Sequence, residues 1–338
     1  VVFGYPGGAI MNVYDEIYKQ NYFQHILNRH EQASIIAAEG YARATGKVGV
    51  SIVTSGPGFT NAVTGLADAY MDSIPLVVIS GQVPTTIIGS DGFQEIDAVG
   101  ISRPCTKHNY LVNRIEDLPR IIKEAFHIAS TGRPGPVHVD IPKDITAQVA
   151  DFIYPSEINL PTYKPTVNYN KKQLKRAMEA ISNAKKPLLY VGGGAVLSNC
   201  AFEIRELAKK LNIPAVETLM ARGVMGDENP LFFGMLGMHG EFAANMAAHE
   251  TDLLISLGAR FDDRVTGRLD EFASKAKVIH VDIDPTSIAK LVVPDYPIVG
   301  DLKITVKAMI EAIENGENEF NDYSNWVELL RDYREKEP

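Results

Sequence analysis

Short apolar runs alternate with helix-spaced stretches along nearly the whole chain, and this alternation restricts the fold more than any other feature. Several runs are apolar on both faces, which is typical of parallel strands covered by helices on each side. Because parallel strands need a long crossover between them, the alternation predicts an α/β fold with open, mostly parallel sheets flanked by helices. In the first block, the expected strands are VVF, HIL, VGVSIV, PLVVIS and PVHVDI, and the expected helices are 9–19, 31–45, 59–71 and 115–130.

A segment rich in Pro, Asn and Tyr interrupts the alternation, as a surface connection does. We therefore expect a first domain at 1–148, a linker at 149–170 and a second open sheet at 171–338. A chain of 338 residues is long enough for two hydrophobic cores. In the second block, the expected strands are PLLYV, IPAVE, DLLISL and KVIHVDI, and the expected helices are 171–184, one near 200, 301–314 and 322–335.

Charge and composition exclude several classes of protein. With 33 Lys and Arg against 42 Asp and Glu, the net charge is 33 − 42 = −9 and no basic run is present, so we expect no nucleic-acid partner. No stretch approaches the ~18 apolar residues of a membrane span. Cys105 and Cys200 lack metal or redox spacing, and the histidines form no HExxH pattern. We expect a cytoplasmic protein without a signal peptide, and no metal ligand within this chain.

Two glycine turns and one acid are the first candidates for a site. Pro6–Gly8 and Ser55–Gly58 each join a strand to a helix, where bare amides favour anions, although each also suits a plain tight turn. Glu31, in the run RHEQ, begins a helix after a strand. The carboxylate either caps that helix or lies in an apolar pocket, where it holds and returns a proton.

Longer motifs extend this pattern over both domains. The first domain contains GYPGGA, RHEQ, AAEGYARATGK, TSGPGFTN, ADAYMDSIPLVVISGQV, GFQE, KHNYLV and GRPGPVHVDIPKD. The second contains YVGGG, ETLMARG, GMLGMHG, SLGARFDDRVTG, VDIDP and VGD. Together these runs resemble the thiamine-diphosphate enzymes, and among them the acetolactate synthase large-subunit family.

The resemblance implies decarboxylation of pyruvate and ligation of the product to a second 2-keto acid. Glu31 would then bond the aminopyrimidine N1′ of thiamine diphosphate. Gly8, Phe93, Gln94 and Lys143 would line the approach to the reacting carbon, and Arg264 would hold the second keto acid's carboxylate. From the residues alone, Gly8 equally serves a turn, Phe93 suits a core and Lys143 suits a solvated loop, whereas Arg264, beside two acids, more often forms a surface ion pair.

The second domain carries signs of a nucleotide site. Three glycines follow the strand PLLYV, and two acids follow KVIHV, positions that suit a pyrophosphate and a ribose. Leu197 stands where the dinucleotide fingerprint wants its last Gly. The resemblance implies FAD, without a redox part in the main reaction. The implied FAD residues are Arg133, Gly192, Gly193, Gly194, Thr218, Leu219, Met220, His239, Gly258, Arg260, Asp262, Asp282, Ile283 and Asp301.

Members of the family continue into a third domain that binds the diphosphate through Mg²⁺, and no such motif occurs here. We therefore expect a segment that is inactive alone, from an enzyme that is a homodimer or tetramer with a separate regulatory small subunit. Two alternatives remain: another flavin-carrying thiamine-diphosphate enzyme, such as pyruvate oxidase or glyoxylate carboligase, or a non-catalytic nucleotide-binding protein. Glyoxylate carboligase lacks the RHEQ acid.

Overall fold

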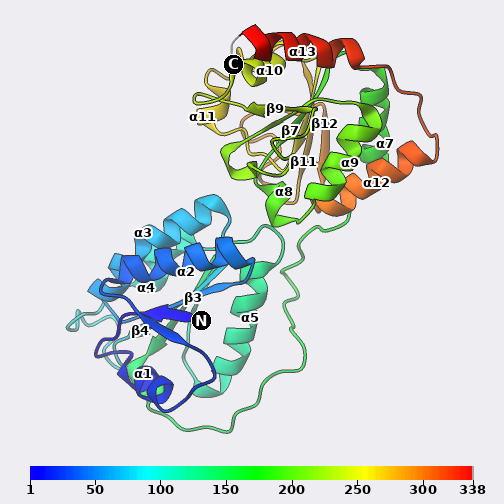
Figure 1. Cartoon of the computed structure of the whole chain (residues 1–338). Helices are drawn as coiled ribbons and strands as arrows, with labels where there is room; N and C mark the ends of the chain where they lie inside the picture. Colours follow the sequence, from blue (N-terminus) through cyan, green and yellow to red (C-terminus); the bar gives the residue numbers. More distant parts are fainter. Residues whose placement is uncertain (337–338) are drawn as a thin grey trace. The chain divides into compact units, whose positions relative to one another are not determined.

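The computed structural model describes residues 1–336 and divides into two compact units, with the division between Lys164 and Pro165. Each unit contains one six-stranded sheet with helices on both faces (Figure 1). All strand pairs in both sheets are parallel. The predicted fold class is confirmed.

The first sheet has the strand order β2-β1-β3-β4-β6-β5. Its strands are β1 Val2–Gly4, β2 His25–Leu27, β3 Gly49–Val53, β4 Leu76–Gln82, β5 His108–Leu111 and β6 Pro136–Pro142. Its helices are α1 Met11–Tyr18, α2 Glu31–Thr45, α3 Pro57–Asp72, α4 Ala98–Ser102, α5 Leu118–Ser130 and α6 Lys143–Thr146. From β1 the chain continues to β2, towards one edge strand, whereas from β3 it continues to β4, towards the opposite edge strand. The carboxyl ends of β1 and β3 therefore form a topological switch point, where open α/β sheets bind ligands.

Alternate side chains of β4 face the two helical layers. Leu76 and Val78 pack with residues of α2 and α3, whereas Val77 packs with residues of α5 on the opposite face. All three are fully buried, so both faces of this central strand are covered. In Figure 1, α2 and α3 lie together and α5 lies across the sheet from them.

The second sheet has the strand order β12-β11-β10-β7-β8-β9, with a switch point between β7 and β10. Its strands are β7 Pro187–Val191, β8 Ala215–Glu217, β9 Phe232–Met235, β10 Leu253–Leu257, β11 Lys277–Asp282 and β12 Tyr296–Val299. Its helices are α7 Lys171–Asn183, α8 Gly194–Leu197, α9 Ala201–Leu211, α10 Phe242–Glu250, α11 Asp263–Thr266, α12 Leu302–Glu314 and α13 Ser324–Lys336. Numbered from β7, this order is the doubly wound arrangement of dinucleotide-binding domains.

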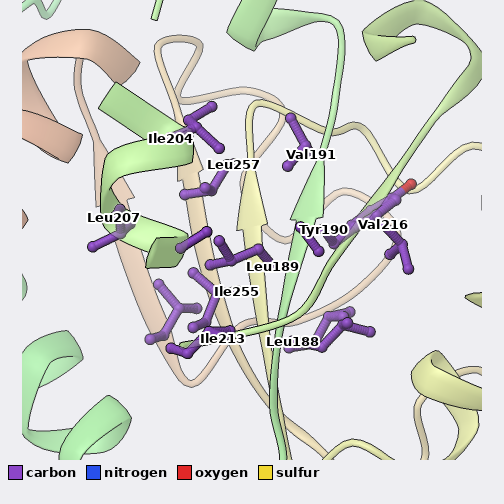
Figure 2. Packing of buried hydrophobic residues seen from close by; sticks show 14 of the residues in the cluster. Leu188, Leu189, Tyr190, Val191, Ile204, Leu207, Ile213, Val216, Ile255 and Leu257 are labelled. Carbon is purple, nitrogen blue, oxygen red and sulfur yellow. The ribbon is translucent and has the colours of Figure 1, made fainter. Parts of the chain in front are cut away.

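One continuous core fills the second unit. Figure 2 shows Ile204 and Leu207 of α9 gathered with Leu189, Ile255 and Leu257 of β7 and β10. Figure 1 shows α7, α9 and α12 together on one side of this sheet, and α10 and α13 together on the other.

The sequence prediction lacked three strands, β5, β9 and β12, together with the helix α10 and the short helices α4, α6, α8 and α11. The strands β5, β9 and β12 are all edge strands, and their sequences HNYL, FFGM and YPIV carry polar, glycine or proline residues that a central strand disfavours. The helix α10 has no polar stripe to reveal it, because it buries four alanines among other apolar residues. The expected helix 115–130 begins as a 3₁₀ turn at Ile115–Asp117 before α5.

Within the residues that the structure describes, every helix is too short or too polar to cross a bilayer.

Candidate functional site

Glu31 is the first residue of α2 and lies buried near the switch point of the first sheet. The His30 ring caps the helix by accepting the backbone N–H of Gln32 at 3.1 Å, so the Glu31 carboxylate is not used as the cap. Instead, Glu31 Oε2 accepts a hydrogen bond from Asn61 Nδ2 of α3 at 3.1 Å. The helix amino end also favours the negative charge.

Two glycine turns leave the room in which this carboxylate lies. A Cβ on Gly58 would lie 2.6 Å from Thr54 Cγ2 and 3.3 Å from Glu31 Oε1, and a Cβ on Gly7 would lie 2.4 Å from the same methyl group. Thr54 Oγ1 accepts the Ala9 N–H at 3.3 Å and so ties the turns after β1 and β3 together. The glycines are therefore needed for close packing around Glu31.

The sequence analysis did not find Asn61 or Tyr14 as parts of this site. Asn61 is the last residue of the motif TSGPGFTN. Its position in the first turns of α3, close to the glycine turn, could have indicated that it belongs to the site. Burial and then the nearby charge of Glu31 raise the pKa of Tyr14, whose hydroxyl donates to Ile52 O at 2.9 Å. Tyr14 lies on α1, and no sequence motif identified it.

The residues expected around the reacting carbon lie in loops at the same edge of the sheet. Gly8 follows β1, Phe93 and Gln94 lie in the loop after β4, and Lys143 follows β6. A Cβ on Gly8 would meet nothing within 4 Å. Phe93 is 89% exposed, which excludes the core position that its residue type allowed. Gln94 and Lys143 are also exposed, and the roles of all four stay proposals.

The loop after β4 is folded by its own polar contacts. The Glu95 carboxylate accepts the N–H groups of Gly89 and Gly92. Thr85 donates its N–H and its hydroxyl to Asp144, at 2.9 and 2.6 Å. Asp144 follows Lys143, so these contacts connect the loop to the turn after β6.

In the second unit, two glycine turns meet at the switch point between β7 and β10. A Cβ on Gly192 would lie 2.3 Å from Gly258 O, and a Cβ on Gly194 would lie 2.9 Å from Gly258 Cα. Gly194 N–H donates to Gly258 O at 3.0 Å. Gly258 has φ +68°, a conformation that glycine adopts without strain. The absence of Cβ atoms therefore lets the two turns pack backbone to backbone at this sheet edge, where open α/β sheets bind dinucleotides.

A buried hydroxyl without a partner lies at the same edge. Thr218 follows β8, and its Oγ1 is buried and makes no hydrogen bond. Leu219 and Met220, the next two residues, are exposed. An unpaired buried hydroxyl costs free energy, so its presence supports a ligand with a polar atom here.

The acids Asp282 and Asp301, which lie at the end of β11 and after β12, already have hydrogen-bond partners within the protein. Asp282, at the end of β11, accepts the Asp284 N–H at 2.8 Å. Asp301, after β12, caps α12 by accepting the Ile304 N–H at 3.0 Å and also accepts the Ser198 hydroxyl at 3.0 Å. Asp301 therefore has a structural role whether or not it also meets a ligand.

The remaining FAD positions follow the strand ends of the second sheet, with one exception. His239 follows β9 and is exposed, and Ile283 follows β11. Arg260 and Asp262 follow β10 and form an ion pair, with 3.6 Å between Arg260 Nη2 and Asp262 Oδ2. Arg133 belongs to the first unit and precedes β6, at the sheet edge opposite to Glu31. There its Nε donates to Ser73 Oγ at 2.7 Å.

Arg264 is exposed on the short helix α11 and lies in the second unit. Its N–H donates to Asp262, and its Nη1 lies 4.0 Å from Met238 Sδ. Neither contact orders the guanidinium strongly, so the structure leaves this group available to a carboxylate.

Comparison with known families matches a stretch of sequence in each of the two units. Residues 1–101 match the N-terminal thiamine pyrophosphate (thiamine diphosphate) binding domain of thiamine pyrophosphate enzymes, and residues 174–309 match their central domain. The chain belongs to the thiamine pyrophosphate enzyme family.

Within that family, the chain is similar to acetolactate synthase large subunits. It is 49% identical to the acetolactate synthase large subunit of Haemophilus influenzae and 48% identical to the isozyme 3 large subunit of Escherichia coli, each over 99% of this chain and 59% of the relative. It is 50% identical to the acetolactate synthase of Mycobacterium leprae over 98% of this chain and 54% of the relative. The chain thus spans a little over half the length of these relatives.

Proposed function

We propose that this chain is the pyrimidine-side and flavin-binding portion of an acetolactate synthase large subunit. The observation that carries the proposal is the buried Glu31 carboxylate, held by Asn61 at the switch point of a sheet whose sequence matches the thiamine pyrophosphate binding domain. The reaction is decarboxylation of pyruvate and ligation to a second 2-keto acid. Similarity to acetolactate synthases over almost the whole chain supports this substrate class.

Thiamine diphosphate, when bound, supplies the electron sink for decarboxylation. The fit to this chain rests on the buried Glu31 carboxylate, whose Oε2 is held by Asn61 and whose Oε1 lies beside Gly58 in the first turn of α3. Glu31 would hold the proton at the pyrimidine ring nitrogen N1′. Gln94 and Lys143 would orient the keto acid, and Arg264 would hold the second keto acid's carboxylate by a forked ion pair.

FAD fits the second unit. The strand order is doubly wound. At one edge of this sheet lie the glycine turns at Gly192–Gly194 and Gly258, together with the Thr218 hydroxyl, which has no hydrogen-bond partner. Such an edge suits the pyrophosphate of a dinucleotide. The FAD-binding residues expected from the sequence are all kept in this proposal, and Asp301 acts in addition as a helix cap.

Further parts of the proposal concern the complete enzyme. Mg²⁺ and the cofactor diphosphate would be bound by the region that relatives carry beyond this chain. Among the described residues, one group of three acids is close enough to hold an ion, namely Glu39, Asp68 and Asp72, but Arg43 already pairs with two of them. A homodimer or tetramer, a regulatory small subunit and a cytoplasmic location complete the proposal.

Replacement of Glu31 tests the function. The protein, extended through its natural reading frame, is assayed with pyruvate, thiamine diphosphate, Mg²⁺ and FAD. We expect acetolactate from the wild type and a loss of at least about a hundredfold in Glu31→Gln, which corresponds to ~2.7 kcal/mol of barrier. Acetate or acetyl phosphate with flavin reduction would instead identify a pyruvate oxidase. Absence of turnover in a soluble extended protein that binds FAD would support a non-catalytic nucleotide-binding protein.

Replacement of Thr218 tests the flavin site separately. Thr218→Val keeps the shape and removes the hydroxyl, so we expect FAD affinity to fall about fivefold to tenfold, by ~1–1.4 kcal/mol, while thermal stability without FAD stays constant or rises. Titration of the 338-residue chain with FAD, followed by flavin fluorescence, measures this. Equal affinity in the two proteins would place the flavin away from Thr218.

A further inference from the structure

A chain of buried polar side chains runs through the first sheet beneath the loop that follows β4. Its five members, each at most 4% exposed, are Ser80, Gln82, Ser102, His138 and Asp140. Ser102 Oγ lies 3.0 Å from His138 Nδ1, and His138 Nε2 lies 2.7 Å from Ser80 Oγ. Ser80 donates to Asp140 Oδ1 at 2.5 Å, and Gln82 Nε2 donates to Asp140 Oδ2 at 2.9 Å.

This arrangement is costly for a central sheet position. Ser80 and Asp140 are register partners on the adjacent strands β4 and β6, where apolar residues normally pack against helices. Burial raises the pKa of Asp140 to about 7 and lowers that of His138 to about 3. The Phe59 ring stacks on His138 with 4.4 Å between ring centres, which closes the network to water. A fully satisfied buried network of this kind rigidifies what it touches.

Gln82 connects the network to the loop. Its Nε2 donates to Ile96 O at 2.9 Å as well as to Asp140, and its Oε1 accepts the Val83 N–H at 2.9 Å. Val83 begins the loop after β4 and Ile96 precedes α4. One carboxamide therefore joins the two ends of the loop, and Asp140 anchors that carboxamide in the sheet.

The loop needs such an anchor, because Gln94 holds an unfavourable backbone conformation. Its φ is +60°, in the left-handed region that L residues other than glycine rarely adopt. The Gln94 backbone lies on Gly56, where a Cβ would come within 2.6 Å of Gln94 O. The contact sets Gln94 and its neighbour Phe93 beside the turn that starts α3, the helix that supplies Asn61.

We propose that Gln82 is a positioning residue that, anchored by Asp140, fixes the loop 83–96 so that Phe93 and Gln94 stay at the edge of the Glu31 site. This role in catalysis rests on the proposed function, whereas the mechanical role in the loop does not. Gln82 itself is 4% exposed and acts through the loop, not on the substrate.

Amide hydrogen exchange of the 338-residue chain tests the mechanical role. Gln82→Met keeps the length of the side chain and removes its donors and acceptor, and we expect amides in 87–97 to exchange at least about tenfold faster, equivalent to ~1.4 kcal/mol of opening. Ser102→Ala is the control, because in the hydrogen-bonded series Ser102–His138–Ser80–Asp140–Gln82 it removes the member farthest from Gln82. In that variant the loop should keep wild-type protection.

A second variant covers the case in which Gln82→Met fails to fold. Gln82→Glu can share a proton with Asp140 but leaves Ile96 O without a side-chain donor, so faster exchange in 87–97 is again expected. Wild-type protection in the folded variants would overturn the proposal. So would loosening by Ser102→Ala that equals the effect of Gln82→Met, because that would reveal a general weakening of the core.

The catalytic role of Gln82 is tested in the longer protein that is obtained by extending this chain through its natural reading frame. Gln82→Met should lower kcat/KM for acetolactate at least about tenfold, whereas solvent exchange of the thiamine diphosphate C2 proton, which depends on Glu31, should stay within about twofold. Equal loss of both rates would overturn a positioning role. If the wild type forms no acetolactate, the proposed function fails, and hydrogen exchange of the loop still decides the mechanical role of Gln82.

Discussion

The ionisation of Asp140 is opposed by its buried surroundings. Burial, and to a lesser extent the charge of Asp97, raise its pKa from 3.8 to about 7, while Ser80 and Gln82 hydrogen bonds oppose the shift. Between these two pH values the folded state binds more protons than the unfolded state. The contribution of Asp140 to stability is therefore present at low pH and is lost as pH rises through about 7.

Asp140→Asn should remove this pH dependence. Between pH 5 and 8 we expect the free energy of unfolding of the wild type to fall, relative to the variant, by about 2–3 kcal/mol. His138 is common to both proteins and its pKa is lowered by burial, so its own titration largely cancels in the difference. Urea unfolding at several pH values, followed by circular dichroism, measures the effect, and parallel stability curves would contradict it.

At the residue scale, the sequence indicated Glu31 but not its surroundings. Its position at a helix start after a strand was visible, whereas Asn61 and Tyr14 come from other helices and meet it only in the folded chain. The polar network around Asp140 was equally hidden, because PVHVDIP reads as a buried strand with scattered polar residues. Such partners depend on strand register, which local patterns do not specify.

At the element scale, the central strands were predicted well, whereas of the edge strands β2 was predicted and β5, β9 and β12 were not. The strands β4, β7 and β10 are buried on both faces and read as continuous apolar runs. The strand β12 contains Pro297 and lies at an edge, where lost hydrogen bonds are tolerated. The switch points that place both candidate sites follow from strand order, which the sequence alone left open.

The close contact between the turns after β7 and β10 predicts that one methyl group added at Gly192 lowers the stability of the second unit. Gly192→Ala would place a Cβ 2.3 Å from Gly258 O and 2.4 Å from Ala259 Cα, and these backbone atoms cannot move without shifting the strands. We expect the second unit to lose about 1–3 kcal/mol of stability and FAD affinity to fall with it. Urea unfolding followed by Trp326 fluorescence is the measurement.

Gly40→Ala is the control for the added methyl group itself, and because Gly40 lies in the first unit its effect is followed by the urea dependence of Cys105 labelling. Gly40 lies within α2, and a Cβ there would meet nothing within 4 Å. The same added methyl should therefore stabilise the helix by about 0.5–1 kcal/mol. A loss of stability in both variants would show that the turn contact is not the cause.

At the scale of the whole molecule, each unit has its own core and its own reporter. Cys105 lies in the first unit and Cys200 in the second, and both thiols are free and buried. Burial raises the pKa of both thiols, and that of Cys200 reaches about 12, so neither should react with an alkylating reagent until its unit opens. The single tryptophan, Trp326, is buried in the second unit and donates to Pro187 O at 3.0 Å.

These reporters allow the two-site proposal to be tested on one chain. FAD at a hundred times its Kd should stabilise the unit that binds it by about 2.7 kcal/mol. We therefore expect FAD to shift the Trp326 transition and Cys200 labelling to higher urea, while Cys105 labelling keeps its midpoint. The Thr218→Val variant at the same FAD concentration should show a smaller shift. A shift of Cys105 equal to that of Cys200 would mean either that the two units unfold as one or that FAD also contacts the first unit, through Arg133.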